Sequence, residues 1–242
     1  MRKHSILLLK SSFAALVLAL APSWSFAFIR TPICSTTIQL VEQQEHWSRF
    51  VKISESEFGV LLKNGHVIPY QFPDVSVPRT ELYKTQNSYW RFWIAYHLLG
   101  FYERRYVDSN MRFYYLSPKE REAYRLRFDN GRIFRAADGR PFDVKRRVEV
   151  VMDQHGNWFA GDRNTKHLAL ALGRSIAFGG LLYAREGYFR YLTRDSGSYR
   201  PLPFHLLQGL EDLQRKKVFD PQKHYQNVSF DLTEDSKIWW KR

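Results

Sequence analysis

The chain has a single cysteine, Cys34, among its 242 residues. A lone thiol cannot form an internal disulfide, and cysteine-based zinc sites need at least two thiolates. No known signature of a catalytic cysteine surrounds Cys34. The fold must therefore be held by its apolar core, and a composition of 44% hydrophobic and 16% aromatic residues is ample for one.

Motifs for metals and nucleotides are also missing from the sequence. It contains no His-Glu-x-x-His pair, no phosphate-binding glycine loop with its lysine, and no dinucleotide fingerprint after a strand. It has no Gly-x-Ser-x-Gly elbow for a serine nucleophile. The pair Gly179-Gly180 lacks the spacing of any of these loops. We therefore expect neither a metal ion nor a cofactor.

The one long apolar run lies near the N-terminus, at residues 13–21. Arg2 and Lys3 precede it, and the small-residue ending Ser25-Phe26-Ala27 follows it. This order predicts a secretory signal peptide, residues 1–27, cleaved after Ala27. The alternative is an anchoring helix, but the run is too short for a bilayer core of about 30 Å. We expect an exported protein, periplasmic or extracellular, with no transmembrane segment after cleavage.

Positive charge dominates the chain, which carries a formal net charge of +13. Loss of Arg2, Lys3 and Lys10 with the signal peptide leaves +10. Such a balance favours an anionic partner, such as an envelope component, an acidic lipid or, less strongly supported, nucleic acid. The bases are spread along the chain rather than gathered in a block, so solubility alone is the competing explanation.

The first half of the chain predicts helices and one hairpin. Apolar residues at helical spacing indicate a short amphipathic helix over about residues 41–51. Asn64-Gly65 between two apolar runs is the strongest hairpin signal in the sequence. A segment with three prolines, residues 69–78, is typical of an extended loop, and Asn87-Ser88 can cap a helix over about residues 89–104 whose aromatic face belongs in the core.

The second half predicts strands. Ser117-Pro118 opens a short capped helix, and three hairpins follow, each with a glycine in its turn. Pro201 and Pro203 introduce a final helix with four leucines on one face. The fold class predicted is α+β: N-terminal helices with a hairpin, then a mainly antiparallel sheet closed by a C-terminal helix, in a single domain over residues 28–242.

The stretch from Arg194 to Pro201, RDSGSYRP, offers the richest polar chemistry. Ser196 or Ser198 could act as a nucleophile if His167 or His205 lay within hydrogen-bond distance. Tyr199 is a further catalytic candidate, and Arg194 and Arg200 are candidates for binding a ligand. The competing interpretation is a plain turn, in which Asp195-Ser196-Gly197 ends a strand and Pro201 starts a helix.

Several blocks in one order resemble the conserved region of the plant IQM proteins, the IQ-motif-containing calmodulin-binding family, and related bacterial, partly toxin-like, proteins. These blocks span about residues 110–220 and include LSPKEREAY from Leu116, VMDQHGNW from Val151, His167, Gly173, Gly179-Gly180, Gly187 and SGSYRP from Ser196. The plant members are known through calmodulin binding and signalling. The resemblance implies membership of an IQM-like family whose enzymology is not established.

The chain departs from the family pattern at two places. His167-Leu168-Ala169 stands where the family typically has His-Ser-Ser, and Ser198 stands where it has a histidine. Any ancestral activity is therefore expected to be weakened. Calmodulin is not expected as a partner, because Ile38-Gln39 begins like an IQ motif but Gln43 stands where a basic residue is required.

Two functional hypotheses follow. The first is an exported bacterial binding or accessory protein, acting on a protein or an anionic partner at the envelope or outside the cell. The alternative is a secreted effector or toxin-like enzyme, a transferase or hydrolase, with a degenerate site of His167, Ser196, Ser198 and Tyr199.

Overall fold

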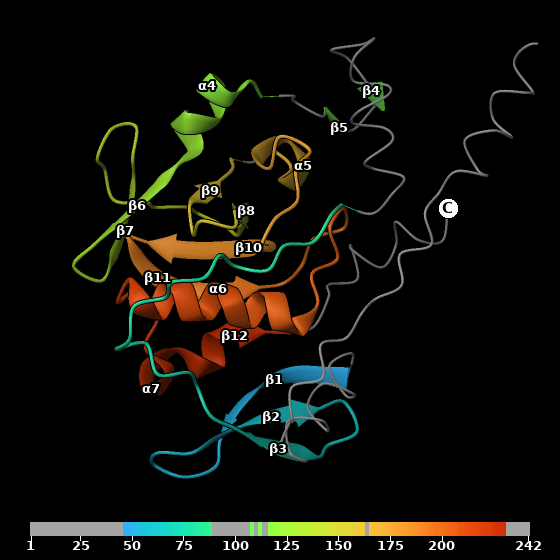
Figure 1. Cartoon of the computed structure of the whole chain (residues 1–242), viewed down its shortest axis with the longest axis vertical. Coiled ribbons are helices and arrows are strands. Elements are labelled where there is room, and N and C mark those ends of the chain that lie inside the picture. The colour runs from blue at the N-terminus through green and yellow to red at the C-terminus, as the bar shows by residue number, and fades with distance from the viewer. Residues whose placement is uncertain (1–45, 89–106, 109–110, 113–115, 163–164, 231–242) are drawn as a thin grey trace, which may run out of the picture. The chain divides into compact units, whose positions relative to one another are not determined.

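The computed structural model describes residues 46–88, 107–108, 111–112, 116–162 and 165–230, all within one compact unit that spans Gln39–Arg242. Eight strands form one mixed sheet in the order β3-β2-β1-β12-β11-β10-β8-β9 (Figure 1). Their bounds are β1 Trp47–Lys52, β2 Phe58–Leu62, β3 Val67–Tyr70, β8 Val148–Met152, β9 Trp158–Ala160, β10 Phe178–Arg185, β11 Tyr188–Thr193 and β12 Val228–Ser229.

Two small ribbons and six helical segments complete the described residues. The ribbons pair β4 with β5 and β6 with β7. The bounds are β4 Val107–Asp108, β5 Met111–Arg112, β6 Leu126–Asp129 and β7 Arg132–Arg135; α4 Pro118–Arg121, α5 His167–Leu170, α6 Pro203–Arg215 and α7 Pro221–His224; and the 3-10 turns η3 Glu122–Tyr124 and η4 Tyr225–Asn227. No helix within these described residues is long and apolar enough to cross a membrane.

The predicted fold class is wrong. The described part of the chain is mostly β, its helices other than α6 are single turns, and the N-terminal part that is described contains strands instead of helices. The sheet is mixed, because β12 runs parallel to β11 while its other neighbour, β1, is antiparallel. Part of the expected first helix, residues 41–45, and the expected helix over residues 89–104 lie outside the described residues.

A β-bulge explains why the segment around β1 looks helical in the sequence. Trp47 pairs with Leu62 and Arg49 with Leu61, so the strand gains one extra residue at this point. The bulge lets Trp47 and Phe50, three positions apart, both be buried, at 2% and 1% exposure. A spacing of three between apolar residues is the usual sign of a helix, and here a bulge produces it.

The four predicted hairpins are confirmed, as β2–β3, β6–β7, β8–β9 and β10–β11. Their turn glycines, Gly65, Gly131, Gly156 and Gly187, all have positive φ, which a residue with a side chain rarely adopts. The predicted capped helix is confirmed as α4. Ser117 Oγ accepts from the Glu120 amide, and the Glu120 carboxylate accepts from the Ser117 amide in return.

Helices α5 and α6 cover opposite faces of the sheet at β8. Val150 and Met152 belong to the main core, which includes Leu206, Leu210 and Leu213 of α6. Val151, between them in the strand, belongs to a second cluster with Leu168 and Leu170 of α5. Successive side chains of a strand point to opposite faces, so β8 carries part of both cores.

An extended segment, residues 71–88, runs along α6 (Figure 1). Arg79 forms an ion pair with Glu211 at 3.0 Å, and the Tyr83 hydroxyl donates to the Asp212 carboxylate at 3.0 Å. Gln208 bonds both the amide and the carbonyl of Lys84. These contacts hold an irregular segment against a regular helix, and Gln86 then pairs with Ile176 ahead of β10.

Candidate functional site

The start of β10 brings His167 and the RDSGSYRP stretch together. The stretch connects β11 to α6, and His167 is the first residue of α5. A Cβ atom placed on Gly179 would lie 3.7 Å from His167 Cδ2 and 3.9 Å from Pro201 Cγ. His167 and the end of the turn therefore border the same glycine, although 34 positions separate them in the sequence.

Both ring nitrogens of His167 are engaged by oxygen acceptors. Nδ1 lies 2.8 Å from Oε2 of Glu149, and Nε2 lies 2.8 Å from the carbonyl oxygen of Gly180. Neither a carboxylate nor a carbonyl can donate, so both bonds need a proton on the ring nitrogen. The side chain is 4% exposed. The geometry is that of a buried imidazolium.

The electrostatics agree with this protonation state. Burial alone would lower the pKa of His167, but the Glu149 carboxylate and the Gly180 carbonyl outweigh it and raise the pKa above its usual value. Burial would likewise raise the pKa of Glu149, and the charges of His167 and Lys166 lower it well below the usual range. An imidazolium held by two acceptors cannot take a proton from a nucleophile, so this bonding is structural rather than that of a general base.

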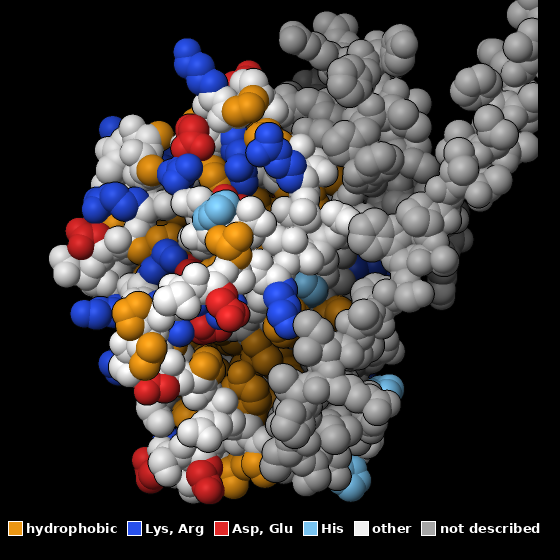
Figure 2. All heavy atoms as spheres, in the orientation of Figure 1, with side chains coloured by type: hydrophobic (Ala, Val, Ile, Leu, Met, Phe, Trp, Pro, Cys, Tyr) orange, Lys and Arg blue, Asp and Glu red, His pale blue; other side chains and the backbone are white. Residues whose placement is uncertain are grey.

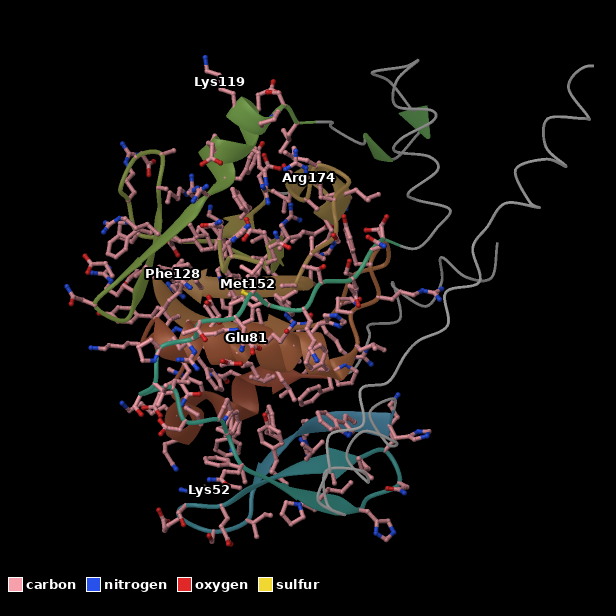
Figure 3. The ribbon with its side chains drawn as sticks, in the orientation of Figure 1. Lys52, Glu81, Lys119, Phe128, Met152 and Arg174 are labelled. Carbon is pink, nitrogen blue, oxygen red and sulfur yellow. The ribbon has the colours of Figure 1, made fainter. Side chains whose placement is uncertain are left out.

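The serine and tyrosine of the turn are buried and bonded to backbone. Ser196 is 2% exposed and its Oγ accepts from the Tyr199 amide at 3.3 Å. Tyr199 is 3% exposed and its hydroxyl donates to the carbonyl of Arg174 at 2.6 Å; Figure 3 labels Arg174, which lies beside α5. Gln86 holds the Tyr199 carbonyl from the other side. The turn is a firmly bonded corner.

Arg194 connects this corner to the end of the sheet. It is 7% exposed, and its guanidinium donates to the carbonyl of Phe230 at 2.5 Å and to that of Pro201 at 2.7 Å. Arg200 is half-buried and adopts a φ of 50°. Ser198 is half-buried, and it follows Gly197, around whose Cβ position there is open space within 4 Å. Ser198 is the candidate closest to an open surface.

His205, the other histidine considered for a triad, is a different kind of group. It lies in the first turn of α6 at 5% exposure, and its Nδ1 has no hydrogen-bond partner among the described residues. Burial lowers its pKa to about 4, so the ring is neutral at pH 7. The catalytic and ligand-binding roles of all these residues stay predictions, and their bonding in the structure is what a packed corner requires.

In the described part of the chain, no cluster of three or more His, Cys, Asp or Glu could hold a metal ion.

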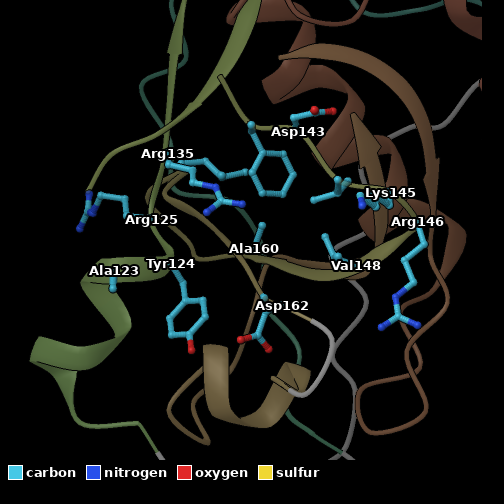
Figure 4. A pocket seen from close by; sticks show the side chains of 14 residues that line it. Ala123, Tyr124, Arg125, Arg135, Asp143, Lys145, Arg146, Val148, Ala160 and Asp162 are labelled. Atoms are coloured by element: carbon cyan, nitrogen blue, oxygen red, sulfur yellow. The ribbon is translucent and has the colours of Figure 1, made fainter. Parts of the chain in front are cut away.

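A cavity elsewhere was not anticipated from the sequence. It has a volume of about 370 Å³ and lies between the β6–β7 ribbon, the segment ahead of β8 and the end of β9 (Figure 4). Arg135, Lys145 and Arg146 line it together with Tyr124 and Asp162. Lys145-Arg146-Arg147, three consecutive bases, was the sequence signal that could have indicated it. Arg135 comes from another segment, so the full set becomes visible only in the fold.

Comparison with known proteins gives no match: no protein-family model, curated protein or solved structure is similar to this chain.

Proposed function

We propose that the chain is an exported bacterial protein of the IQM-like family that acts as a binding or accessory protein at the envelope or outside the cell. One observation carries the non-enzymatic part of the proposal. His167, Ser196 and Tyr199, the polar groups expected to carry chemistry, are each less than 5% exposed and each bonded to groups of the protein itself. Groups committed in this way stabilise a fold and are not available to a substrate.

The proposed partner is an anionic component of the envelope. The mature chain would carry a net charge of +10, and Figure 2 shows Lys and Arg side chains scattered over the face in view with acids between them. Such a distribution attracts an extended polyanion or an anionic surface without a single dense patch. The nucleic-acid alternative shares this electrostatic basis and is separated from it by the test.

Binding of the mature chain, residues 28–242, to vesicles of phosphatidylcholine with and without phosphatidylglycerol tests the partner class. We expect binding only to the anionic vesicles, and affinity that falls steeply as salt is raised. A duplex DNA of matched charge serves as the comparison. Affinity independent of salt, or binding to DNA alone, would contradict an envelope partner.

Ser198 provides the test of the enzymatic alternative. It is the half-buried candidate beside open space, and it stands where the family pattern has a histidine. Wild type, Ser198→His and Tyr199→Phe are incubated with an envelope extract, and covalent changes are followed by mass spectrometry. We expect no turnover by wild type. Turnover by wild type that Tyr199→Phe abolishes would overturn the binding-protein proposal in favour of a transferase or hydrolase.

A further inference from the structure

The cavity beside the β6–β7 ribbon has the size and lining of a small-molecule site. Its volume of about 370 Å³ falls within the usual range for ligand pockets, about 300 to 1,000 Å³. Phe142, Val148 and Ala160 supply apolar lining and are at most 7% exposed. A hollow with an apolar wall and charged groups around it suits a ligand that has an apolar body and a charged end.

The charge of this cavity that has no partner in the described part of the chain is positive and belongs to three exposed side chains. Arg135, Lys145 and Arg146 have no ion-pair or side-chain hydrogen-bond partner among the described residues. The fourth base, Arg125, is paired with Glu122 at 2.6 Å. Three cations are therefore left for a ligand.

The two acids of the lining already have partners in the protein. Asp143 accepts from the Glu186 amide at 3.2 Å. Asp162 accepts from the amide and the hydroxyl of Thr165, at 3.0 and 2.8 Å. Their carboxylates hold backbone segments in place, so they are not set aside for a cationic ligand.

The three cations come from two segments: Arg135 from the end of β7, and Lys145 and Arg146 from the segment ahead of β8. In Figure 4 Arg135 reaches in from the β7 side, Arg146 lies across the view from it, and the ring of Tyr124 borders the hollow near Asp162. Arg125 extends outward instead, which agrees with its pairing to Glu122. A ligand in this cavity would meet cations from more than one side.

We propose that this cavity binds a phosphate monoester whose substituent is small and apolar or aromatic. A dianionic phosphate suits several unpaired cations, and the planar guanidinium forms paired bonds with phosphate oxygens. The substituent packs on Phe142, Val148 and Ala160. This proposal depends on neither the export nor the family of the chain, and a discrete pocket is distinct from the dispersed surface charge discussed above.

Calorimetric titration of the mature chain with phenyl phosphate tests the site, with inorganic phosphate and phenol as the two half-ligands. We expect phenyl phosphate to bind at least about tenfold more tightly than either half. Arg135→Ala and Arg146→Ala should each weaken phenyl phosphate by about tenfold or more, with Arg135→Lys intermediate because a lysine keeps the charge but loses the paired geometry. Arg190→Ala removes the same charge from an exposed position of β11 outside the cavity and should leave binding unchanged.

Each outcome has a defined meaning. Thermal unfolding of every variant first shows that the fold is intact. Two results would overturn the proposed site and leave only general charge attraction. One is phenyl phosphate that binds no more tightly than inorganic phosphate. The other is an equal loss of affinity in Arg190→Ala and Arg135→Ala. If the pocket binds phenyl phosphate, vesicles with and without phosphatidic acid identify the source of the ligand. Binding of the protein to phosphatidic acid vesicles that phenyl phosphate competes away assigns a lipid headgroup. A lack of such competition assigns a soluble monoester.

Discussion

His167 illustrates how a residue that resembles a catalytic group can serve the fold. The two residues after this histidine, Leu168 and Ala169, are 4% and 2% exposed. Leu168 packs in the second core cluster with Tyr199. These apolar residues fit a short helix that packs against β8, and the imidazolium joins α5 to Glu149 and to Gly180.

Replacing His167 should cost stability in a pH-dependent way. His167→Gln removes the buried positive charge beside Glu149, while Lys166 stays 3.0 Å from that carboxylate, so we expect a loss of about 1.5 to 3 kcal/mol in free energy of unfolding. The folded-state pKa of His167 lies above its unfolded value, so its stabilisation is complete below about pH 6.5 and is lost as the pH rises through the folded pKa. Urea denaturation of wild type and variant between about pH 6 and pH 9 should show a difference in free energy of unfolding that becomes smaller as the pH increases.

Two variants make this prediction specific. His66→Gln changes an exposed histidine and should not alter the pH dependence. A cycle with Glu149→Gln measures the coupling between the two side chains. A stability difference that stays constant across the pH range would show that the pKa of His167 is the same in the folded and unfolded chain, and one that widens as the pH rises would show that the ring is neutral in the fold.

The strand β10 needs both of its glycines because neighbouring groups approach them closely. A Cβ on Gly180 would lie 1.8 Å from the carbonyl oxygen of Thr193, and one on Gly179 would lie 2.7 Å from Ile176 Cδ1. The pair therefore allows close approach of the adjacent strand and of the second core. Gly180 also supplies the carbonyl that accepts from His167. The two glycines therefore serve close packing at the start of β10.

Alanine at Gly180 should be poorly tolerated. The nearest obstacle is backbone, which cannot rotate away, so we expect a loss of about 3 kcal/mol or more in free energy of unfolding. Gly197→Ala, in open space, is the matched control and should change stability by less than about 1 kcal/mol. Chemical denaturation checks both. Equal stability of the two variants would mean that β10 and β11 can separate without cost.

The two parts of the large sheet are joined by β12, a strand of two residues. β12 pairs with β1 on one side and with β11 on the other, so among the described strands it alone connects β1–β3 to the β8–β11 region in one sheet. Phe230 follows β12, is fully buried, and contacts Trp47 and Phe50 with ring centroids 5.1 and 5.0 Å apart. Its amide donates to Ser48 and its carbonyl accepts from Arg194.

Phe230→Ala should therefore weaken the junction between the two ends of the sheet. Removal of a buried phenylalanine ring typically costs about 3 to 5 kcal/mol. We expect earlier hydrogen exchange at Phe50 and Val60 than at Val150, because β1 and β2 would detach first. Tyr188→Ala, an aromatic residue that is 48% exposed, should cost less than about 1 kcal/mol. Uniform acceleration of exchange across both groups would contradict a junction role.

Local features of this protein could be predicted from its residues, and they hold in the structure. The glycine turns, the Ser117 capping box and the leucine face of α6 each involve neighbours in sequence, so composition and spacing suffice to find them. β1 was wrongly predicted as a helix because its bulge depends on the partner strand β2. Its register cannot be inferred from its own residues.

The site required contacts between residues distant in sequence. The sequence alone indicated that His167 and the RDSGSYRP stretch were candidate polar groups. The fold showed that they meet at Gly179. It also showed their bonds: His167 to Gly180, Tyr199 to Arg174 and Arg194 to Phe230. The cavity cations lie on different strands and loops, so no spacing along the chain marks them as one set. Burial and the choice of hydrogen-bond partner decide whether a polar side chain is free to react, and both arise only when distant segments pack.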